Sequence, residues 1–337
     1  MECSPPLKVI SAMRQPYRQV SVSSPGKLVV SGEYAVLYGA SALSLAVNRR
    51  AHCSLLVRDE GHWELRSSPP FWNETESLQD LVSKNRTDSL SATLKWFVEH
   101  DKLPEHCSLH MNTERFFSKQ RKLGLGSSAG VLVTLYASLA TLSALPMQVE
   151  DVLRIYSATQ AQGSGVDVLT SYSGGLVQVK EQTCTSAELP AGIYLDIYSV
   201  GFSTETASMI GRFRKGFDNL PVSLQDSFIA AADTAADSLT DKNEFFNALQ
   251  NFIKIYRSVD SKSKLAIWSV QHETMHELAL DVGVLYKPSG AGGGDIGVAV
   301  ATEQQRLKAL RHKVVDLPVT LLDLQRDSNG VRVEKTA

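Results

Sequence analysis

A glycine-rich segment that runs straight into an apolar, helix-forming stretch is the feature that most limits how this chain can fold. The segment reads Gly124-Leu-Gly-Ser-Ser-Ala-Gly130, and the pattern of residues 127–143 predicts a helix. Glycine permits positive φ at such a turn, and the first helical turn presents free backbone N–H groups at the positive end of the helix dipole. This order predicts an anion site, where Ser127 and Ser128 add hydroxyl groups able to touch a phosphate or magnesium. Taken alone, the segment fits a serine-capped structural helix equally well.

Two further segments combine glycine with lysine and strengthen the anion-site interpretation. They are Pro25-Gly26-Lys27 and Lys287-Pro-Ser-Gly-Ala-Gly-Gly-Gly-Asp295. Three consecutive glycines lose much conformational entropy on ordering, which indicates a close approach of backbone to another group; a turn entering a strand is the alternative. The glycine segments lack the Walker A and Rossmann spacings, and the chain has neither the His-Arg-Asp nor the Asp-Phe-Gly motif of protein kinases.

Length and charge restrict the class of protein. With 337 residues the chain is long enough for two domains, and its 43% hydrophobic content supports large cores. The 34 basic and 36 acidic residues nearly cancel, so no long-range field attracts nucleic acid or an anionic membrane. We therefore expect no nucleic-acid partner, no membrane association, and only local binding of anions.

The cysteines and the N-terminal residues predict a cytoplasmic protein. The N-terminal segment carries basic residues and prolines without an apolar stretch, so it does not predict a secretory signal. The longest uncharged run, residues 131–147, is rich in serine and threonine and predicts a buried helix rather than a membrane span. The cysteines lie far apart, which argues against a thiolate zinc site, a redox motif or a disulfide framework: Cys3, Cys53, Cys107 and Cys184.

Apolar periodicity predicts strands and helices mixed in both halves of the chain without a regular strand–helix repeat, which favours an α+β fold. We expect strands at residues 19–31, 42–57, 107–112, 175–180, 193–200 and 296–301, and two terminal strands. We expect helices at residues 77–100 with a break at 85–88, and at 127–143, 149–162, 204–216, 223–256, 262–282 and 303–312. Polar residues and a proline interrupt the pattern at residues 182–190, so one lobe is expected in residues 1–185 and another in residues 186–337.

Together, the three glycine segments resemble the motifs of the GHMP family of small-molecule kinases. The first motif reads Ser24-Pro-Gly-Lys-Leu-Val-Val-Ser-Gly-Glu-Tyr-Ala-Val36, the second covers residues 124–130, and the third covers residues 287–297. The resemblance extends over about residues 20–300. It implies a two-lobe GHMP kinase fold, with an N-terminal α/β lobe that binds ATP and a C-terminal ferredoxin-like α+β lobe. It also implies ATP and Mg²⁺ as cofactors and a small-molecule substrate.

The resemblance assigns roles to individual residues. Asp167, in Gly163-Ser-Gly-Val-Asp167, is implied as the catalytic base, paired with Lys27, which also offsets charge on the transferring phosphoryl group. Helix capping is the alternative role for Asp167. The ATP-binding residues are Gly124, Leu125, Gly126, Ser127, Ser128 and Ala129, with Ser128 as the magnesium ligand. The substrate-binding residues are Glu33, Tyr34, Ser164, Lys287, Ser289, Gly290 and Gly292.

Within the family the sequence is most similar to the phosphomevalonate kinase branch. Gly32-Glu-Tyr-Ala-Val36, Ala46-Val-Asn-Arg49 and Ala161-Gln-Gly-Ser-Gly-Val-Asp-Val168 carry this similarity, together with the third motif. The mevalonate kinase branch is next, and Tyr38-Gly39 resembles it more closely. The implied reaction converts ATP and phosphomevalonate to ADP and diphosphomevalonate in the mevalonate route to isoprenoids. Mevalonate or another small molecule is the alternative acceptor, and a homodimer is left open.

An acceptor that already carries a phosphate requires a second group of cationic side chains. The candidates are Arg49, Arg50, Arg212, Arg214, Lys215 and Lys287. For most of them, a solvated basic face is the simpler interpretation.

Two competing functions remain at this point. His272-Glu-Thr-Met-His276 fits the H-E-x-x-H pattern of zinc hydrolases, but the glycine of the extended motif is replaced by Ala279 and no third ligand is evident. The other competitor is a non-catalytic GHMP-fold protein that senses a metabolite, since a scaffold can keep its shape after losing its reaction. The presence of Lys27, Ser128 and Asp167 argues against this second hypothesis.

Overall fold

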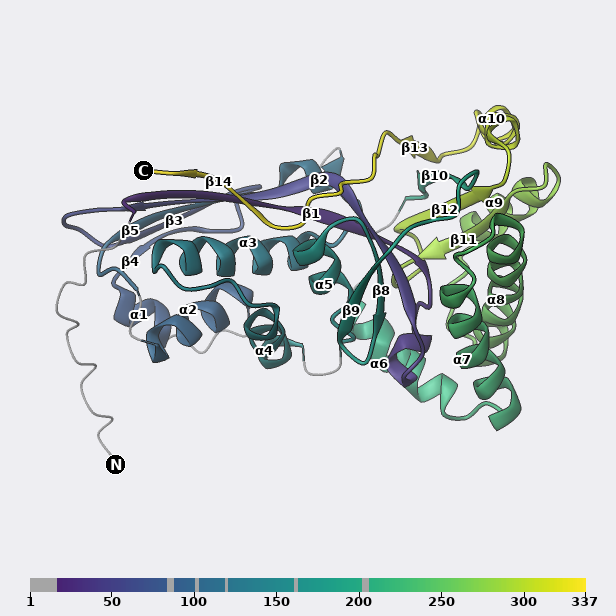
Figure 1. Ribbon diagram of the computed structural model, residues 1–337, viewed down its shortest axis with the longest axis horizontal. Helices are drawn as coiled ribbons and strands as arrows, with labels where there is room; N and C mark the ends of the chain where they lie inside the picture. Colours follow the sequence, from purple (N-terminus) through teal and green to yellow (C-terminus); the bar gives the residue numbers. More distant parts are fainter. Residues whose placement is uncertain (1–16, 84–87, 101–102, 119–120, 161–162, 202–205) are drawn as a thin grey trace.

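Two long antiparallel strands, β1 (Gln19–Ser31) and β2 (Ala42–Val57), run through the first lobe and reach the junction with the second (Figure 1). The computed structural model describes residues 17–83, 88–100, 103–118, 121–160, 163–201 and 206–337. The pairing of β1 with β2 shifts between Pro25 and Gly26. A β-bulge of this kind bends a strand and redirects the side chains that follow it, which here begin with Lys27.

An eight-stranded sheet forms the first lobe. Its main path runs β14-β1-β2-β5-β3-β4, with β8 pairing with both β2 and β9. The other strands of this sheet are β3 (Trp63–Ser68), β4 (Asn73–Glu76), β5 (Cys107–Asn112), β8 (Leu176–Lys180), β9 (Thr183–Ala187) and β14 (Arg332–Thr336). A short hairpin precedes the glycine-rich segment and consists of β6 (Phe117–Ser118) and β7 (Arg121–Lys122), after the 3₁₀ turn η2 (Glu114–Phe116).

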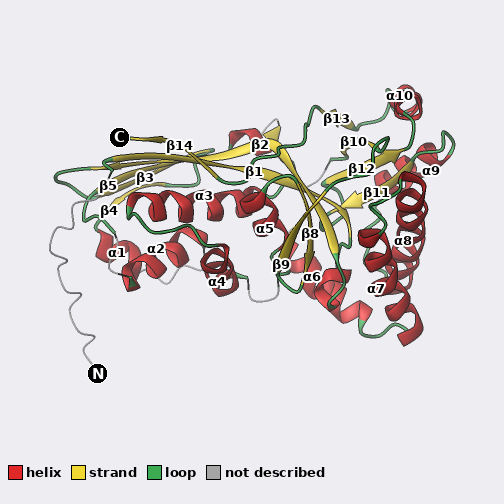
Figure 2. Ribbon diagram, viewed as in Figure 1, coloured by secondary structure: helices red, strands yellow, loops and turns green. Residues whose placement is uncertain are grey.

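Helices cover one face of this sheet (Figure 2). Helix α3 lies directly on β1 and β2, and most of its side chains are buried, as expected for a helix that is apolar on nearly all sides. The helical elements of this lobe are α1 (Leu78–Ser83), α2 (Ser89–Glu99), α3 (Ser127–Leu142), α4 (Val149–Thr159), α5 (Val166–Ser173) and the 3₁₀ turn η1 (Ala35–Tyr38).

The second lobe has the ferredoxin-like order of elements, strand–helix–strand–strand–helix–strand, with several helices in the first crossover. Its antiparallel sheet is ordered β11-β12-β10-β13, which matches that topology. The strands are β10 (Tyr194–Ser199), β11 (Leu285–Ser289), β12 (Ile296–Ala301) and β13 (Thr320–Leu322). The helices are α6 (Thr206–Phe217), α7 (Val222–Asp237), α8 (Lys242–Ser263), α9 (Val270–Leu280) and α10 (Gln304–Lys313).

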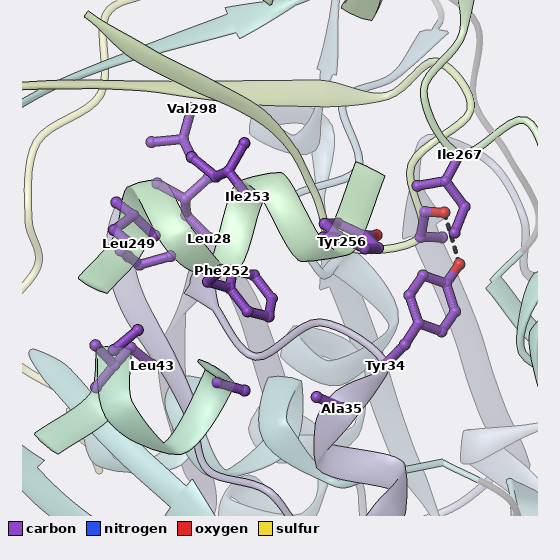
Figure 3. Packing of buried hydrophobic residues seen from close by; sticks show 14 of the residues in the cluster. Leu28, Tyr34, Ala35, Leu43, Leu249, Phe252, Ile253, Tyr256, Ile267 and Val298 are labelled. Carbon is purple, nitrogen blue, oxygen red and sulfur yellow. Dashed lines mark hydrogen bonds between the residues drawn. The ribbon is translucent and has the colours of Figure 1, made fainter. Parts of the chain in front are cut away.

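The two lobes share one hydrophobic core. Leu28 and Leu43 of the first sheet belong to the same buried cluster as Phe252 of α8 and Val298 of β12 (Figure 3). Burial of apolar side chains on both sides of the junction stabilises the relative placement of the lobes. The walls of a site between them are therefore held by packing.

The C-terminal residues return to the first lobe. Strand β14 pairs with β1 along one edge of the large sheet, and Figure 1 shows it far from the rest of the second lobe. Just before it, Val331 donates a backbone hydrogen bond to the carbonyl of Tyr172 at the end of α5, at 2.9 Å. Gly330 lies so close to α5 that a Cβ would collide with the Tyr172 backbone. The return segment therefore packs against the helix that carries Asp167.

The α+β class and the two-lobe arrangement expected from the sequence are confirmed. Strands β1, β2, β5 and β12 have the predicted bounds, and Asp88 caps α2 after the predicted break by accepting from the Ser91 N–H at 2.8 Å. The expected helix at residues 149–162 ends at Thr159, and residues 161–162 lie outside the described part of the chain. Several short strands were not predicted: β3, β4, β6, β7, β9 and β11. Within the described ranges, no helix combines the length and apolar character needed to cross a bilayer.

Candidate functional site

The three glycine segments, far apart in the sequence, meet at the junction of the lobes. The backbone N–H of Lys27 donates to the carbonyl of Leu125 at 2.9 Å, which joins the first segment to the second. The hydroxyl of Ser289 accepts from the Val29 N–H at 3.0 Å and donates to the Val29 carbonyl at 2.8 Å, which joins the first segment to the third. A Cβ on Gly124 would lie 2.7 Å from the Cβ of Asp295, so the second and third segments also touch.

A cavity of about 550 Å³ opens where these segments meet. Nine of the site residues expected from the sequence line it: Lys27, Glu33, Tyr34, Gly124, Gly126, Ser128, Ser164, Asp167 and Gly290. The other expected residues do not line it: Leu125, Ser127, Ala129, Lys287, Ser289 and Gly292. A second cavity of about 210 Å³ is lined mainly by aliphatic side chains, and its one charged side chain, Arg326, is paired with Glu188. The larger cavity is thus the candidate active site.

The glycine-rich segment presents backbone to this cavity. Helix α3 starts after Gly126, which has φ of 80° and forms no side-chain capping hydrogen bond, so the serine-capped interpretation is wrong. A glycine cap leaves the first-turn N–H groups available to an anion. Ser128 is exposed beside them, while the side chains of Leu125 and Ala129 turn into the protein and anchor the segment.

Lys27 and Asp167 reach the cavity from different elements. The aliphatic part of Lys27 packs on the second segment, since a Cβ on Gly126 would lie 2.9 Å from the Lys27 Cγ. Its Nζ lies 3.6 Å from the place a Cβ would occupy on Gly290. Asp167 stands in the first turn of α5, after Gly165, and its Oδ1 accepts from the Val168 N–H at 3.0 Å.

The expected ion pair between Lys27 and Asp167 is not formed. The ion pairs of the described residues include none between these two side chains, although both line the same cavity. The reason is the course of the Lys27 side chain along Gly126 toward Gly290, where its charge acts on Glu33 and Lys287. Asp167 does not cap α5, because Gly165 occupies the N-cap position and no side chain caps the helix; the Asp167 carboxylate accepts only from the N–H of the next residue, Val168.

The oxygen ligands around the cavity fit a nucleotide-bound magnesium ion. The Ser128 hydroxyl and the Asp167 carboxylate both line it, and magnesium prefers such oxygen ligands together with phosphate oxygens and water. The described residues contain no group of three or more histidine, cysteine, aspartate or glutamate side chains placed to hold a metal by themselves. A metal there would therefore depend on the phosphates of the nucleotide for most of its ligands.

Tyr34 is held firmly in the cavity wall. Its backbone has φ of 61°, which is unusual for a residue other than glycine and costs of order 1–3 kcal/mol. Its ring stacks on Phe213 at 4.2 Å between centroids. Its hydroxyl donates to the carbonyl of Ala291 at 2.7 Å, the hydrogen bond drawn as a dashed line at Tyr34 in Figure 3. Burial raises the pKa of this hydroxyl, so it remains a donor. Tyr34 thus links η1, α6 and the third glycine segment.

Lys287 lies behind the wall rather than in it. Its side chain is 0% exposed and pairs with the carboxylate of Glu33, which is 1% exposed. Burial lowers the pKa of Lys287 and raises the pKa of Glu33, and the attraction between the two charges opposes both shifts. Direct substrate contact by Lys287, as expected from the sequence, conflicts with this placement because the ammonium group already has protein acceptors.

The remaining basic candidates also lie away from the cavity. Arg50 is buried against Asp327, at 2.6 Å, and Arg212 donates to the carbonyl of Leu265 at 3.1 Å. None of Arg49, Arg50, Arg212, Arg214 or Lys215 is among the residues that line the cavity.

Sequence reasoning missed several lining residues. Lys122 extends its ammonium group to 3.5 Å from the Ser128 hydroxyl, and its position two residues before Gly124 was the available signal. The other missed lining residues include Tyr156, Gln160, Ile210, Ala291 and Asp295.

The H-E-x-x-H segment has a structural role. His272 is buried, with its Nδ1 2.9 Å from the Tyr286 hydroxyl, and burial lowers its pKa to about 3. Glu273 points elsewhere and pairs with Arg257 of α8 at 2.5 Å, while His276 Nδ1 lies 3.0 Å from the Tyr286 carbonyl. These contacts attach α9 to β11 and α8, and they leave no arrangement resembling a zinc hydrolase site.

Comparison with known proteins agrees with this geometry. Residues 93–175 match the family described as GHMP kinases N terminal domain. A mevalonate kinase of Schizosaccharomyces pombe is 25% identical over 94% of this chain and 92% of its own length. A phosphomevalonate kinase of Saccharolobus solfataricus is 23% identical over 94% of this chain and 99% of its own length. The crystal structure of Streptococcus pneumoniae phosphomevalonate kinase with phosphomevalonate and AMPPNP has a TM-score of 0.78 at 18% identity, over 91% of this chain and 99% of that one.

The domain match lies across the glycine-rich segment and Asp167, and the homologous sequences extend over nearly the whole chain. The similar structure shows that the two-lobe fold is shared. Residues 93–175 therefore carry the GHMP kinases N terminal domain, and the relatives that are similar over nearly the whole chain are a mevalonate kinase and a phosphomevalonate kinase.

Proposed function

We propose that this protein transfers the γ-phosphoryl group of ATP to phosphomevalonate, giving ADP and diphosphomevalonate. The observation that carries the proposal is the meeting of three glycine segments around one cavity lined by Lys27, Ser128 and Asp167. Phosphoryl transfer needs in-line positioning and neutralisation of charge far more than covalent chemistry, so a cavity of this construction suits it.

The second glycine segment would bind the phosphates of ATP. The N–H groups at the start of α3, the Ser128 hydroxyl and the Lys122 ammonium group all face the same side of the cavity. Magnesium, when bound with the nucleotide, neutralises phosphate charge, and Ser128 and Asp167 are the side chains we assign to hold it. The expected ATP-binding residues Leu125, Ser127 and Ala129 would then act through their backbone.

Asp167 would direct the acceptor oxygen, and Lys27 would offset the charge that develops on the transferring group. In this assignment the absence of a direct contact between the two in the structure leaves room for an acceptor between them. An alcohol acceptor would give its proton to Asp167, whereas an ionised phosphate acceptor would need only orientation. Glu33, Tyr34, Ser164 and Gly290 would form the acceptor wall.

We base the choice of an acceptor that carries a phosphate on two lysines of the cavity wall, which also contains the carboxylates of Glu33, Asp167 and Asp295. Lys27 and Lys122 are the cationic side chains that line it in the described part of the chain, and a triphosphate together with a second phosphate needs more than one of them. Mevalonate is the second candidate acceptor, because mevalonate kinases are among the relatives that match nearly the whole chain. As part of this proposal we retain two lobes, residues 1–185 and 186–337, with two exceptions: β9 continues in the first-lobe sheet to Ala187, and β14 returns to that sheet.

ADP release in the presence of ATP and Mg²⁺ tests the proposal. The acceptors are phosphomevalonate, mevalonate and a panel of sugars, each compared with the Asp167→Asn variant to exclude contaminating kinases. We expect kcat/KM to be greatest with phosphomevalonate. If mevalonate is turned over faster than phosphomevalonate, mevalonate is the acceptor and the proposed substrate is wrong. If no acceptor is turned over although the nucleotide binds, the result favours the non-catalytic sensor.

A further inference from the structure

A glycine shortly before α5 is required by a neighbouring side chain rather than by its own backbone. Gly163 does not have positive φ, so its backbone conformation suits residues that have a side chain. A Cβ at this position would nevertheless overlap the hydroxyl oxygen of Tyr156 and lie 2.7 Å from its Cζ. Carbon atoms in contact are about 3.5–4 Å apart, so a side chain here would displace the tyrosine. Glycine at this position therefore allows Tyr156 to reach the backbone.

Tyr156 comes from the last part of α4, and its ring reaches the start of α5. It is 6% exposed and lines the cavity. The backbone N–H of Gly165 donates to its hydroxyl oxygen. Burial, and after it the charge of Asp167, raises the pKa of this hydroxyl, so it stays neutral. One helical turn earlier on α4, Leu153 lies 3.1 Å from the place that a Cβ would occupy on Gly165. One face of α4 therefore contacts both glycines before α5.

Backbone hydrogen bonds also attach Gly163 to the end of α4. Its N–H donates to the Gln160 carbonyl at 3.0 Å, and the Gln160 N–H donates to the Tyr156 carbonyl at 2.8 Å. Helix α5 then begins after Gly165, which has φ of 75° and provides no capping side chain. Since no side chain caps the helix, the contacts from α4 determine where its first turn begins.

We propose that Tyr156 is a positioning residue whose hydroxyl group fixes the start of α5 and thereby directs the Asp167 carboxylate into the cavity. This inference rests on the proposed function, in which Asp167 directs the acceptor oxygen. Ser164 lies between the two glycines that α4 contacts, and it lines the cavity as well. A shift of the start of α5 therefore moves both residues together. A displacement of about 1 Å in groups of this kind can lower a reaction rate about 10²-fold.

Tyr156→Phe removes the hydroxyl group and keeps the ring. We expect it to lower kcat about tenfold or more and to change the KM of ATP by less than about twofold, because the glycine-rich segment before α3 is unaltered. Tyr136→Phe is the matched control: the Tyr136 hydroxyl accepts from the Gln148 N–H at 3.0 Å at the N-cap of α4, and Tyr136 does not line the cavity. The control should lose a similar amount of stability in chemical denaturation and keep kcat within about twofold. A contact that is only structural would leave kcat of Tyr156→Phe unchanged as well, and that result would overturn the proposal.

Changes of side-chain size test the contact between Gly163 and Tyr156 itself. Gly163→Ala should lower kcat about 10²-fold, because the new Cβ overlaps the hydroxyl oxygen and pushes the start of α5 away from α4. The double variant Gly163→Ala/Tyr156→Leu should be no slower than Tyr156→Leu alone, since the shorter side chain makes room for the Cβ.

Gly211→Ala in α6 is the control for the glycine. Gly211 also lacks positive φ, and nothing lies within 4 Å of the added atom, so kcat should stay unchanged. If the effects of Gly163→Ala and Tyr156→Leu multiply in the double variant, the two residues act independently and the proposal is wrong. If Gly163→Ala does not fold, the kinetics of Tyr156→Phe decide the matter.

Failure of the proposed function would look different. In that case the unaltered protein would turn over no acceptor in the panel, whatever the behaviour of the variants. Crystal structures of Gly163→Ala and of its double variant with Tyr156→Leu then test the positioning role without an acceptor. Displacement of Asp167 in the single variant and its return in the double variant support the role. An Asp167 carboxylate that stays in place in Gly163→Ala contradicts it.

Discussion

The two sides of the cavity are built on different physical principles. On the side that we assign to the nucleotide, the side chains of Ser128 and Lys122 are exposed at the start of α3. On the side that we assign to the acceptor, Glu33 and Lys287 are sealed from water and pair with each other. A ligand that brings its own counter-ions, such as a nucleotide with magnesium, suits an open, adaptable surface. A small acceptor needs a wall arranged before it arrives, and that wall carries a large desolvation cost.

Asp167→Asn gives the largest effect that this comparison predicts. We expect kcat to fall by about 10²–10⁴-fold, the usual contribution of a positioned acid–base group. Since Asp167 lies in the first turn of α5 and forms only one local hydrogen bond, the unfolding free energy should change by less than about 1 kcal/mol. Single-turnover kinetics and thermal unfolding measure the two quantities. An unchanged kcat would remove Asp167 from the reaction.

Breaking the buried pair should affect stability most. Lys287→Met leaves Glu33 buried without its partner, and we expect it to lower the unfolding free energy by about 3–5 kcal/mol. The double variant Glu33→Gln/Lys287→Met should recover much of this loss, because neither charge then remains buried. Chemical denaturation of the three variants provides the measurement. A loss in the double variant equal to the sum of the two single losses would show that the pair is not coupled.

Gly126→Ala tests the contact between the second glycine segment and the Lys27 side chain. The position has φ of 80°, and the new Cβ would lie 2.9 Å from the Lys27 Cγ, so both strain and a displaced Lys27 are expected. Gly39→Ala is a suitable control, because Gly39 has φ of 86° and nothing within 4 Å of the added atom. Both should lose about 1–2 kcal/mol of stability from backbone strain, but Gly126→Ala alone should lower kcat/KM by about tenfold or more. Equal kinetic losses in both variants would discount the Lys27 contact.

The unfolding free energy should fall at acid pH because of the buried histidine His272. His272 has a pKa of about 3 in the folded protein and about 6.5 when unfolded, so the unfolded chain binds the proton first as the pH falls. Stability from this group is present above pH 6.5 and should decline by about 1.4 kcal/mol per pH unit between pH 6.5 and pH 3. Denaturation of the protein and of His272→Gln at pH 7, 6 and 5 isolates the effect. Parallel pH curves for the two proteins would contradict it.

The smallest stability effect is expected on the open side. Lys122→Met should change the unfolding free energy by less than about 0.5 kcal/mol, since this side chain is exposed. It should raise the KM of ATP several-fold, and less so at high salt, because solvent and ions screen its charge. Kinetics at two ionic strengths measure this. An effect on the acceptor KM alone would assign Lys122 to the acceptor phosphate instead.

The parts of the fold that could be predicted from the sequence are those with strong local patterns. The long strands β1 and β2 and the apolar helix α3 carry continuous hydrophobic signals. Strand β4, with the sequence Asn-Glu-Thr-Glu, and β9, with Thr-Cys-Thr-Ser-Ala, have little apolar alternation and form because a neighbouring strand is present. Strand β11 includes Pro288, which is compatible with its place at a sheet edge but removes the sequence signal.

The candidate site also contains residues that local sequence patterns predict and residues whose placement depends on tertiary packing. The glycine segments and the residues beside them could be identified from motif order, because backbone geometry demands glycine there. Which lysine faces the cavity could not, since that depends on how the lobes meet. Lys287 belongs to the third segment, yet its ammonium group is buried in an ion pair with Glu33 and does not line the cavity. Lys122 lies just outside the second segment and does line it. Motif spacing also does not predict that the Lys27 side chain packs along Gly126 instead of pairing with Asp167.

The return segment imposes an order on the assembly of the site during synthesis. Residues 326–331 cover the end of the helix that carries Asp167 and supply Asp327 to the buried Arg50, although they emerge from the ribosome more than 150 residues after that helix. A nascent chain that already contains all three glycine segments still lacks this support. Under the proposed function, the segments assigned to the nucleotide would therefore be complete in a growing chain before Asp167 is held in place, and phosphoryl transfer would begin only after residues 326–331 have been synthesised.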